Sequence, residues 1–372
     1  KLFINTFFPP YPSKAFNTFF SAVKQRKRIP FSAYFAVTHK CPYACPHCSY
    51  ARRRNSDIST KDALNIVTQL KNLPTPIIGF TGGEPLLRED LPQLIRAAKP
   101  ESATILFTTG CNLSASLAKD LKTAGLDSIM IGIESPDPKT HDKIRNSPGS
   151  FEQALKAVNI ARDTGFYTAI STIATREKMQ DNQVTKLAQL AQKLKIHEFR
   201  ILQPVPTGSA LNNKNFTLTT QQTRQMIDFH KSWNRKFDYP AISTFAHLES
   251  PQMFGCGAGY HHLFIDSMAN VCPCDLTPLS FANALEKPLK EIWAELEKFF
   301  ALPRTRCIMK DLQLPQIPQN QNLPLSPEQS EKLCRSLPKD HPLPAMYKNL
   351  LSRRNKECHP NSQPSPEKSP RK

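Results

Sequence analysis

Residues 33–48 read AYFAVTHKCPYACPHC, a short apolar run that is followed at once by three cysteines. The run at 33–38 is rich in aromatic and aliphatic residues and predicts a buried strand. Cys41, Cys45 and Cys48 lie on the loop directly after it, with the spacing C-x3-C-x2-C. Three thiolates on one short loop can hold one face of an iron–sulfur cluster, and a fourth iron without a protein ligand is left open for chemistry.

Zinc is the alternative metal for this loop. A structural zinc site takes four ligands, and His39 or His47 could add the fourth to the three cysteines. The loop by itself leaves both metals open. The chain has ten cysteines and its start lacks the features of an export signal. We therefore expect a reducing compartment, the cytoplasm, where clustered cysteines bind metal more often than they form disulfides.

The sequence around the cysteine loop alternates between short apolar runs and longer amphipathic stretches. Strands are predicted at 33–38, 77–81, 103–109, 128–134, 167–174 and 198–203, and the helices between them at 60–71, 90–98, 114–124, 151–164 and 182–194. Six β–α repeats in series predict an α/β fold with a parallel sheet and right-handed crossovers. Periodicity does not choose between an open doubly wound sheet and an incomplete barrel.

A second motif, Gly82-Gly83-Glu84-Pro85, lies at the end of the second predicted strand. Ligands bind at the carboxyl ends of parallel strands. Two glycines there let the backbone come close to a ligand, and Glu84 offers an acceptor for an ammonium group. Because the preceding strand end carries the cysteine loop, we expect both motifs to face the same opening.

The cysteine loop after the first strand, followed by residues 82–85 after the second, resembles the radical S-adenosylmethionine (SAM) superfamily. The resemblance implies a partial (β/α)6 TIM-type barrel and a [4Fe-4S] cluster on Cys41, Cys45 and Cys48, which favours iron over zinc. It also implies that SAM binds the open iron, and that its reductive cleavage gives a 5′-deoxyadenosyl radical that abstracts hydrogen from a substrate.

The resemblance also implies roles for residues at the strand ends. Gly82, Gly83 and Glu84 match the family's contacts to the methionyl amino group of SAM, and His47 matches a position near the adenine. The ribose contacts match less closely, because this chain reads Gly-Ile-Glu-Ser-Pro-Asp where the family often has Ser-x-Asp. They are assigned to Glu134, Ser135 and Ser171, with Thr172 as an alternative to Ser171.

Arg145 ends a His-Asp-Lys-Ile-Arg run that is typical of this part of the superfamily. Two interpretations are open for it, a role in the site and a surface ion pair. No catalytic residue beyond the cofactor contacts is assigned.

A further group of cysteines follows in the C-terminal third of the chain. Cys256, Cys274 and Cys307 resemble the ligands of a SPASM/twitch segment, which implies one auxiliary iron–sulfur cluster. Only one is expected, because no C-x2-C pair follows Cys274. The fourth position of this cluster is open between Cys334, Cys272 and an iron without a protein ligand.

The remaining cysteines and the aromatic start have simpler interpretations. We expect Cys111 to be a buried free thiol, Cys358 to be a thiol of the tail, and His261 and His262 to be packed. The phenylalanines within residues 3–20 are expected to cover the open side or the base of the barrel.

The predicted organisation has four parts. Residues 1–30 form an N-terminal extension and 31–210 the core barrel. Residues 211–314 hold a linker helix and the small, Cys-containing α+β extension. Residues 315–372 are a tail rich in proline and lysine that we expect to be partly disordered.

The function expected from the sequence is a radical SAM reaction on a peptide or a cofactor precursor. The alternatives are nucleotide or RNA modification, and a non-catalytic zinc or iron–sulfur binding module. The net charge of +18 is compatible with a solvated basic surface or with an anionic partner. A reduced flavodoxin- or ferredoxin-type protein is the expected electron donor, and no apolar run is long enough to span a membrane.

Overall fold

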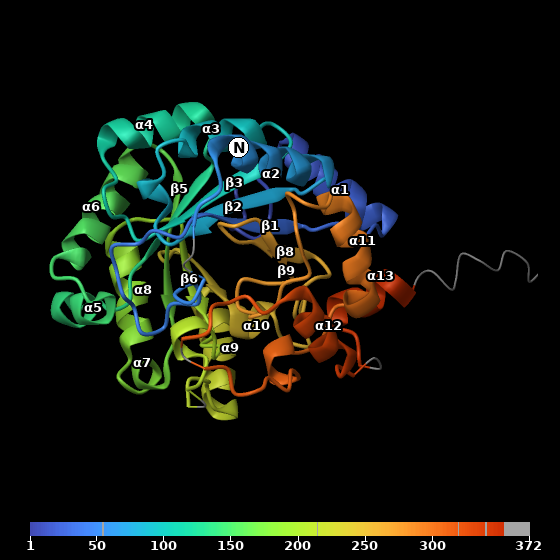
Figure 1. Ribbon diagram of the computed structural model, residues 1–372. Helices are drawn as coiled ribbons and strands as arrows, with labels where there is room; N and C mark the ends of the chain where they lie inside the picture. Colours follow the sequence, from blue (N-terminus) through green and yellow to red (C-terminus); the bar gives the residue numbers. More distant parts are fainter. Residues whose placement is uncertain (54–55, 214, 319, 339–340, 353–372) are drawn as a thin grey trace, which may run out of the picture.

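The computed structural model describes residues 1–53, 56–213, 215–318, 320–338 and 341–352. Its centre is one ten-stranded sheet in the order β10-β9-β8-β1-β2-β3-β4-β5-β6-β7 (Figure 1). The strands are β1 (Ser32–Thr38), β2 (Ile77–Gly82), β3 (Ala103–Thr108), β4 (Ser128–Gly132), β5 (Tyr167–Ile173), β6 (Glu198–Leu202), β7 (Ala241–Thr244), β8 (His262–Ile265), β9 (Asn270–Cys272) and β10 (Ala282–Asn283).

The helices follow the strands along the chain. They are α1 (Lys14–Gln25), α2 (Thr60–Asn72), α3 (Leu91–Ala98), α4 (Ala115–Ala124), α5 (Pro138–Arg145), α6 (Ser150–Asp163), α7 (Arg176–Gln180), α8 (Gln183–Lys193), α9 (Thr220–Trp233), α10 (Phe245–Leu248), α11 (Leu289–Phe300), α12 (Pro327–Arg335) and α13 (Ala345–Ser352), with short 3₁₀ turns at Pro85–Leu87, Gly208–Ala210 and Ile308–Lys310. None of the described helices is long and apolar enough to cross a membrane.

The six predicted β–α repeats are confirmed. Strands β1 to β6 pair in parallel and in chain order, and the helices between them lie on the outer face of the curved sheet (Figure 1). Helices on one face only, around a curved sheet, are the arrangement of a partial barrel, which excludes the doubly wound alternative. The core between sheet and helices is aliphatic, with Ile66, Leu94 and Leu121 fully buried.

Two parallel strands were not predicted. β7 extends the sheet beyond β6, and β8 pairs in parallel with β1 on the side opposite to β2. β8 then turns into β9, its antiparallel neighbour. The cysteine-containing C-terminal segment is thereby joined to the barrel wall through β1, the strand that leads into the first cysteine loop.

The N-terminal extension closes the base of the barrel. The backbone N–H of Thr6 donates to Glu198 at the start of β6 (2.8 Å), and the guanidinium of Arg200 lies over the ring of Phe7, 4.2 Å from its centroid. The starts of parallel strands lie at the end of the barrel opposite to the strand ends that carry ligands. Of the two predicted places for this aromatic segment, the structure therefore places it at the base.

The chain stays packed against the molecule beyond residue 314. Leu323, Leu325 and Leu337 are buried, and α12 begins with a capping box formed by Ser326 and Gln329. The sequence did not predict that these leucines are buried, because they are too widely spaced to show a helical or strand period. The tail was expected to be only partly disordered, and the described part of 315–352 is its ordered part. The residues from 353 on, Cys358 included, lie outside the described residues.

Candidate active site between two cysteine triads

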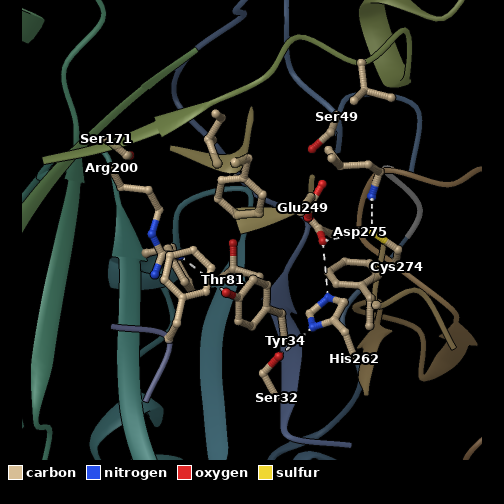
Figure 2. A pocket seen from close by; sticks show the side chains of 18 of the residues that line it. Ser32, Tyr34, Ser49, Thr81, Ser171, Arg200, Glu249, His262, Cys274 and Asp275 are labelled. Atoms are coloured by element: carbon tan, nitrogen blue, oxygen red, sulfur yellow. Dashed lines mark hydrogen bonds and ion pairs between the residues drawn. The ribbon is translucent and has the colours of Figure 1, made fainter. Parts of the chain in front are cut away.

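A cavity of about 1030 Å³ occupies the inside of the barrel. We define the N-terminal triad as Cys41, Cys45 and Cys48, and the C-terminal triad as Cys256, Cys274 and Cys307. All six cysteines line this cavity. Figure 2 shows Ser171 and Arg200 on one wall, and Cys274, Asp275 and His262 on the opposite wall. The two triads, which are more than two hundred residues apart in the sequence, therefore line one cavity.

The N-terminal triad lies on the loop after β1, as predicted. Cys45 is buried, and Cys41 and Cys48 are half-buried. Burial, followed by the charges of Glu84, Cys48 and Cys45, raises the pKa of Cys41 to about 11. Thiolates so placed need positive charge nearby, and the Arg145 guanidinium lies 3.5 Å from the Cys45 sulfur. The loop is thus suited to hold a positively charged metal group.

The spacing of the sulfurs separates a cluster from a single ion. Four ligands of one zinc ion, each about 2.3 Å from the metal, lie about 3.8 Å from one another. Among the described residues, the three ligand atoms that all lie within 4.8 Å of one another are those of His262, Cys274 and Asp275. The sulfurs of neither triad form such a group, so no compact single-ion site is found at either triad among the described residues.

Gly82 and Gly83 are required by the cysteine loop itself. A side chain on Gly82 would overlap the carbonyl oxygen of Thr38, and one on Gly83 would overlap that of Lys40. The Gly83 N–H donates to Thr38 O (2.8 Å), and the Glu84 N–H donates to Lys40 O (2.7 Å). The glycines therefore seat the loop against the end of β2, and both also line the cavity.

Gly83→Ala is expected to displace the cysteine loop, because the added methyl group has no space beside Lys40 O. We expect a several-fold loss of iron after anaerobic reconstitution and a decrease of about 1–3 kcal/mol in the free energy of unfolding. Gly149→Ala is the matched control, since nothing lies within 4 Å of the added carbon, although its φ of +79° carries strain. If Gly83→Ala keeps the iron content of Gly149→Ala, the glycine does not seat the loop.

Glu84 lies behind the cavity wall. Its buried carboxylate accepts hydrogen bonds from the Thr108 hydroxyl (2.6 Å), the Thr109 N–H (2.8 Å) and the Leu86 N–H (3.1 Å). Burial raises the pKa of this group, although these hydrogen bonds oppose the shift. The carboxylate joins the end of β2 to the end of β3, and it is not among the residues that line the cavity. Its predicted contact to the amino group of SAM remains a prediction.

Glu134 is the centre of a buried charge network at the end of β4. Its carboxylate pairs with Lys178 (2.7 Å), Arg145 (3.3 Å) and His47 (3.4 Å). Burial disfavours the ionised form, but the charges of Lys178 and His47 prevail and hold the pKa of Glu134 well below its usual range. One carboxylate thus fixes the cation beside Cys45 and the histidine of the cysteine loop.

The structure brings most of the predicted ribose and adenine residues together. His47, Glu134, Ser171 and Thr172 line the cavity. Ser135 does not, since its hydroxyl accepts the Asp137 N–H (3.1 Å) at the start of α5. Its predicted ribose contact is left without support from the geometry.

Arg145 is buried, so the alternative of a surface ion pair is wrong for it. Lys178, the strongest partner of Glu134, was not identified from the sequence. A lysine in a polar stretch after a strand gives no signal of burial.

The C-terminal triad is assembled by a β-bridge. Cys256 N donates to Arg304 O (2.7 Å), which brings the segment of Cys307 beside Cys256. A hydrogen bond from the Cys307 thiol outweighs burial and lowers the pKa of Cys256 to about 6. The Cys307 thiol thus favours the thiolate form of Cys256, the form that binds metal.

The structure places the other candidate cysteines outside the cavity lining. Cys272 is fully buried with its sulfur 3.1 Å from Arg53, and Cys334 is buried on α12 beside Arg304 and Glu331. Cys111 is buried next to Tyr43 and Cys45, as expected for a packed thiol. Neither Cys272 nor Cys334 lines the cavity beside the C-terminal triad.

His261 and His262 are both half-buried at the cavity wall. His262 pairs with Asp275 (3.4 Å) and shares a hydrogen bond with Ser32 (2.8 Å). His261 stacks on Phe31 and is hydrogen-bonded to the Tyr347 hydroxyl (2.7 Å). Burial lowers the pKa of His261 to about 3, so it is neutral at physiological pH. Both are packed as predicted, and both also face the cavity.

Two domain families match the sequence. Residues 35–191 match the radical SAM superfamily, and residues 256–310 match an iron–sulfur cluster-binding domain named SPASM. These two ranges contain the N-terminal and the C-terminal triad.

The chain is similar to curated proteins of related kinds. It is 27% identical over 290 residues to an AdoMet-dependent heme synthase of Nitratidesulfovibrio vulgaris, an alignment that covers 71% of this chain and 78% of the relative. It is 26% identical over 285 residues to a PqqA peptide cyclase of Rhizobium meliloti, with 73% of this chain and 76% of the relative covered.

Solved structures share the fold at lower sequence identity. Streptococcus suis SuiB bound to its precursor peptide SuiA has a TM-score of 0.58 at 18% identity, covering 73% of this chain and 67% of SuiB. The enzyme anSMEcpe, with bound AdoMet and a peptide, has a TM-score of 0.59 at 17% identity, covering 87% of this chain and 99% of the neighbour. These likenesses concern the partial barrel and its C-terminal extension.

Proposed function

We propose that this chain, a radical SAM enzyme with a SPASM-type cluster-binding segment, abstracts a hydrogen atom from a peptide or a cofactor precursor that binds between its two cysteine triads. Its cofactors are a [4Fe-4S] cluster with SAM and an auxiliary iron–sulfur cluster. The observation that carries the proposal is the single cavity lined by both triads. A substrate bound there would lie within reach of both cluster sites.

The N-terminal triad would hold the cluster that binds SAM. Bound there, the cluster would supply the electron for the reductive cleavage of SAM to methionine and a 5′-deoxyadenosyl radical. The protein's part is to position the reactants and to exclude water. Arg145 balances the negative charge of the thiolates, and Glu134 holds Arg145 and His47 in place. Gly82 and Gly83 keep the loop close to the end of β2.

The substrate class is proposed from the lining of the cavity and from the relatives. The walls are mainly apolar, with Phe107, Phe245 and Phe254 among the rings, and Arg200 is a buried cation on the wall. A volume of about 1030 Å³ lies at the upper end of the roughly 300–1,000 Å³ of small-molecule sites. SAM together with part of a larger molecule would fit this space. The names of the two curated relatives refer to heme and to a peptide.

The basic charge suits an acidic electron carrier. A reduced flavodoxin- or ferredoxin-type protein is the proposed donor, and the net charge of +18 would favour its encounter with this chain at low salt. Nucleotide or RNA modification has no comparable support, because it rested on the charge alone.

Hydrogen abstraction can be detected as deuterium that passes from a labelled substrate into 5′-deoxyadenosine. The anaerobically reconstituted enzyme would be incubated with SAM, a reductant, and extract from cells grown in heavy water. We expect deuterium in 5′-deoxyadenosine when either the peptide fraction or the small-molecule fraction is supplied. Protease treatment should remove the label if a peptide is the donor and leave it if a cofactor precursor is.

The same comparison of fractions can also contradict the proposed substrate class. If the RNA fraction alone supplies deuterium, and ribonuclease removes it, the proposed substrate class is wrong. The Cys41→Ser/Cys45→Ser/Cys48→Ser variant is the control, since it should form no labelled product from any fraction.

A further inference from the structure

The C-terminal triad offers three thiolates to a cluster whose four irons each have an outer ligand position. The two cysteines that could have completed the set, Cys272 and Cys334, lie outside the cavity lining. Of the other described cysteines, three belong to the N-terminal triad and Cys111 lies beside it. Among the described residues, a fourth protein ligand would then be a residue other than cysteine.

Glu249 lies at the right place for this role. It follows α10, comes seven residues before Cys256, and lines the cavity together with all three cysteines of the triad. Figure 2 shows Glu249 beside Asp275 and Cys274. Glu249 therefore faces the same space as the three sulfurs of the triad.

Within the described part of the chain, no hydrogen bond or ion pair of the Glu249 carboxylate is found, which sets it apart from the buried carboxylates of the barrel. Glu84 accepts from Thr108 and Thr109, and Glu134 pairs with three cationic side chains. Glu198 accepts from Thr6. Glu249 is half-buried at the cavity wall, so its carboxylate is available to a positively charged group in the cavity.

Asp275 is the other carboxylate near the triad, and its surroundings differ. It already pairs with His262, and its oxygen lies 3.5 Å from the sulfur of its neighbour Cys274. Asp275 is therefore already engaged, whereas Glu249 approaches the triad from a different element.

We infer that Glu249 is the fourth protein ligand of the auxiliary cluster, a carboxylate in the position that a fourth cysteine would take. The inference rests on the proposed function, because it requires that the C-terminal triad holds a cluster. Carboxylate oxygen is a harder ligand than thiolate and binds iron in proteins. A filled fourth position would leave the auxiliary cluster with no open iron for the substrate.

The Cys41→Ser/Cys45→Ser/Cys48→Ser variant isolates the auxiliary cluster for the test. Its iron and sulfide content would be measured after anaerobic reconstitution, and the electron paramagnetic resonance spectrum of the reduced protein would be recorded with and without cyanide, which binds an open iron. We expect the spectrum of this parent to be unchanged by cyanide. Adding Glu249→Gln should shift the spectrum and make most of the signal respond to cyanide.

Two further variants make the outcome specific. Glu249→Cys should keep the iron content of the parent and restore its insensitivity to cyanide. Asp275→Asn should also remain insensitive, because it removes the nearest other carboxylate and leaves Glu249 in place. The inference is overturned if the parent already responds to cyanide, if Glu249→Gln changes nothing, or if Asp275→Asn responds instead. A parent without iron would contradict the auxiliary cluster itself, which is a separate result.

Discussion

Serine in place of Cys41, Cys45 or Cys48 is expected to bring the formation of 5′-deoxyadenosine from SAM below detection. We propose these three cysteines as the protein ligands of the SAM-binding cluster, and a serine hydroxyl does not ionise at neutral pH to replace a thiolate. The other cysteines that line the cavity in the described part of the chain are those of the C-terminal triad, which we assign to the auxiliary cluster. The measurement is nucleoside production by the reduced, anaerobically reconstituted variants.

The C-terminal triad supplies the control for this result. Cys256→Ser or Cys274→Ser should remove only part of the iron and leave some SAM cleavage, because the SAM-binding cluster remains. If the variants of the two triads lose activity to the same extent while the C-terminal variants keep the N-terminal cluster, the assignment of separate roles is contradicted.

Glu134→Gln is expected to lower the free energy of unfolding by about 3–5 kcal/mol at neutral pH. The change removes the one carboxylate that pairs with Lys178, Arg145 and His47, and leaves buried cations without a counter-charge. Chemical denaturation under anaerobic conditions measures the difference. Glu152→Gln, an exposed position on α6, is the matched control and should change the free energy by less than about 0.5 kcal/mol.

The pH dependence of this difference has a defined sign. The neighbouring cations hold the pKa of Glu134 well below its usual value of 4.5 in the folded state. The stabilisation it gives is therefore fully present above pH 4.5 and is lost as the pH falls through the lower folded pKa. The difference in the free energy of unfolding between the wild-type chain and Glu134→Gln should therefore become smaller below pH 4.5. A difference that stays constant from pH 7 to below pH 4.5 would show that the carboxylate does not act through its charge.

The barrel could be predicted because its strands and helices are local patterns. Each of the first six strands is an apolar run followed by an amphipathic helix, and the cysteine loop and residues 82–85 mark two strand ends. β7 and β8 were missed because each has four residues, too few for a period. The parallel pairing of β8 with β1 joins residues 230 positions apart, and local sequence patterns contain no information about such a contact.

The candidate site was predicted where residue type alone indicates chemistry. The six cysteines and the two glycines are of this kind. The interaction of Glu134 with Lys178 depends on α7, a five-residue helix that the sequence pattern did not show. Glu249 lies in a Leu-Glu-Ser run that matches no motif, so the sequence did not identify it. Only the fold places it on the cavity that the C-terminal triad lines. Cys272 and Cys274 are indistinguishable by spacing, and only the contact of Cys272 with Arg53 separates them.

Two clusters on one cavity, of which the N-terminal one reacts with SAM, can be tested in a single sample. The protein would be purified anaerobically, reduced and given SAM, and its metal content and its 5′-deoxyadenosine would both be quantified. We expect an iron- and sulfide-containing protein that forms 5′-deoxyadenosine and methionine, and a triple serine variant of the N-terminal triad that retains part of the iron and forms neither product. A protein that carries zinc and leaves SAM intact after iron–sulfur reconstitution would show that the triads do not hold these clusters.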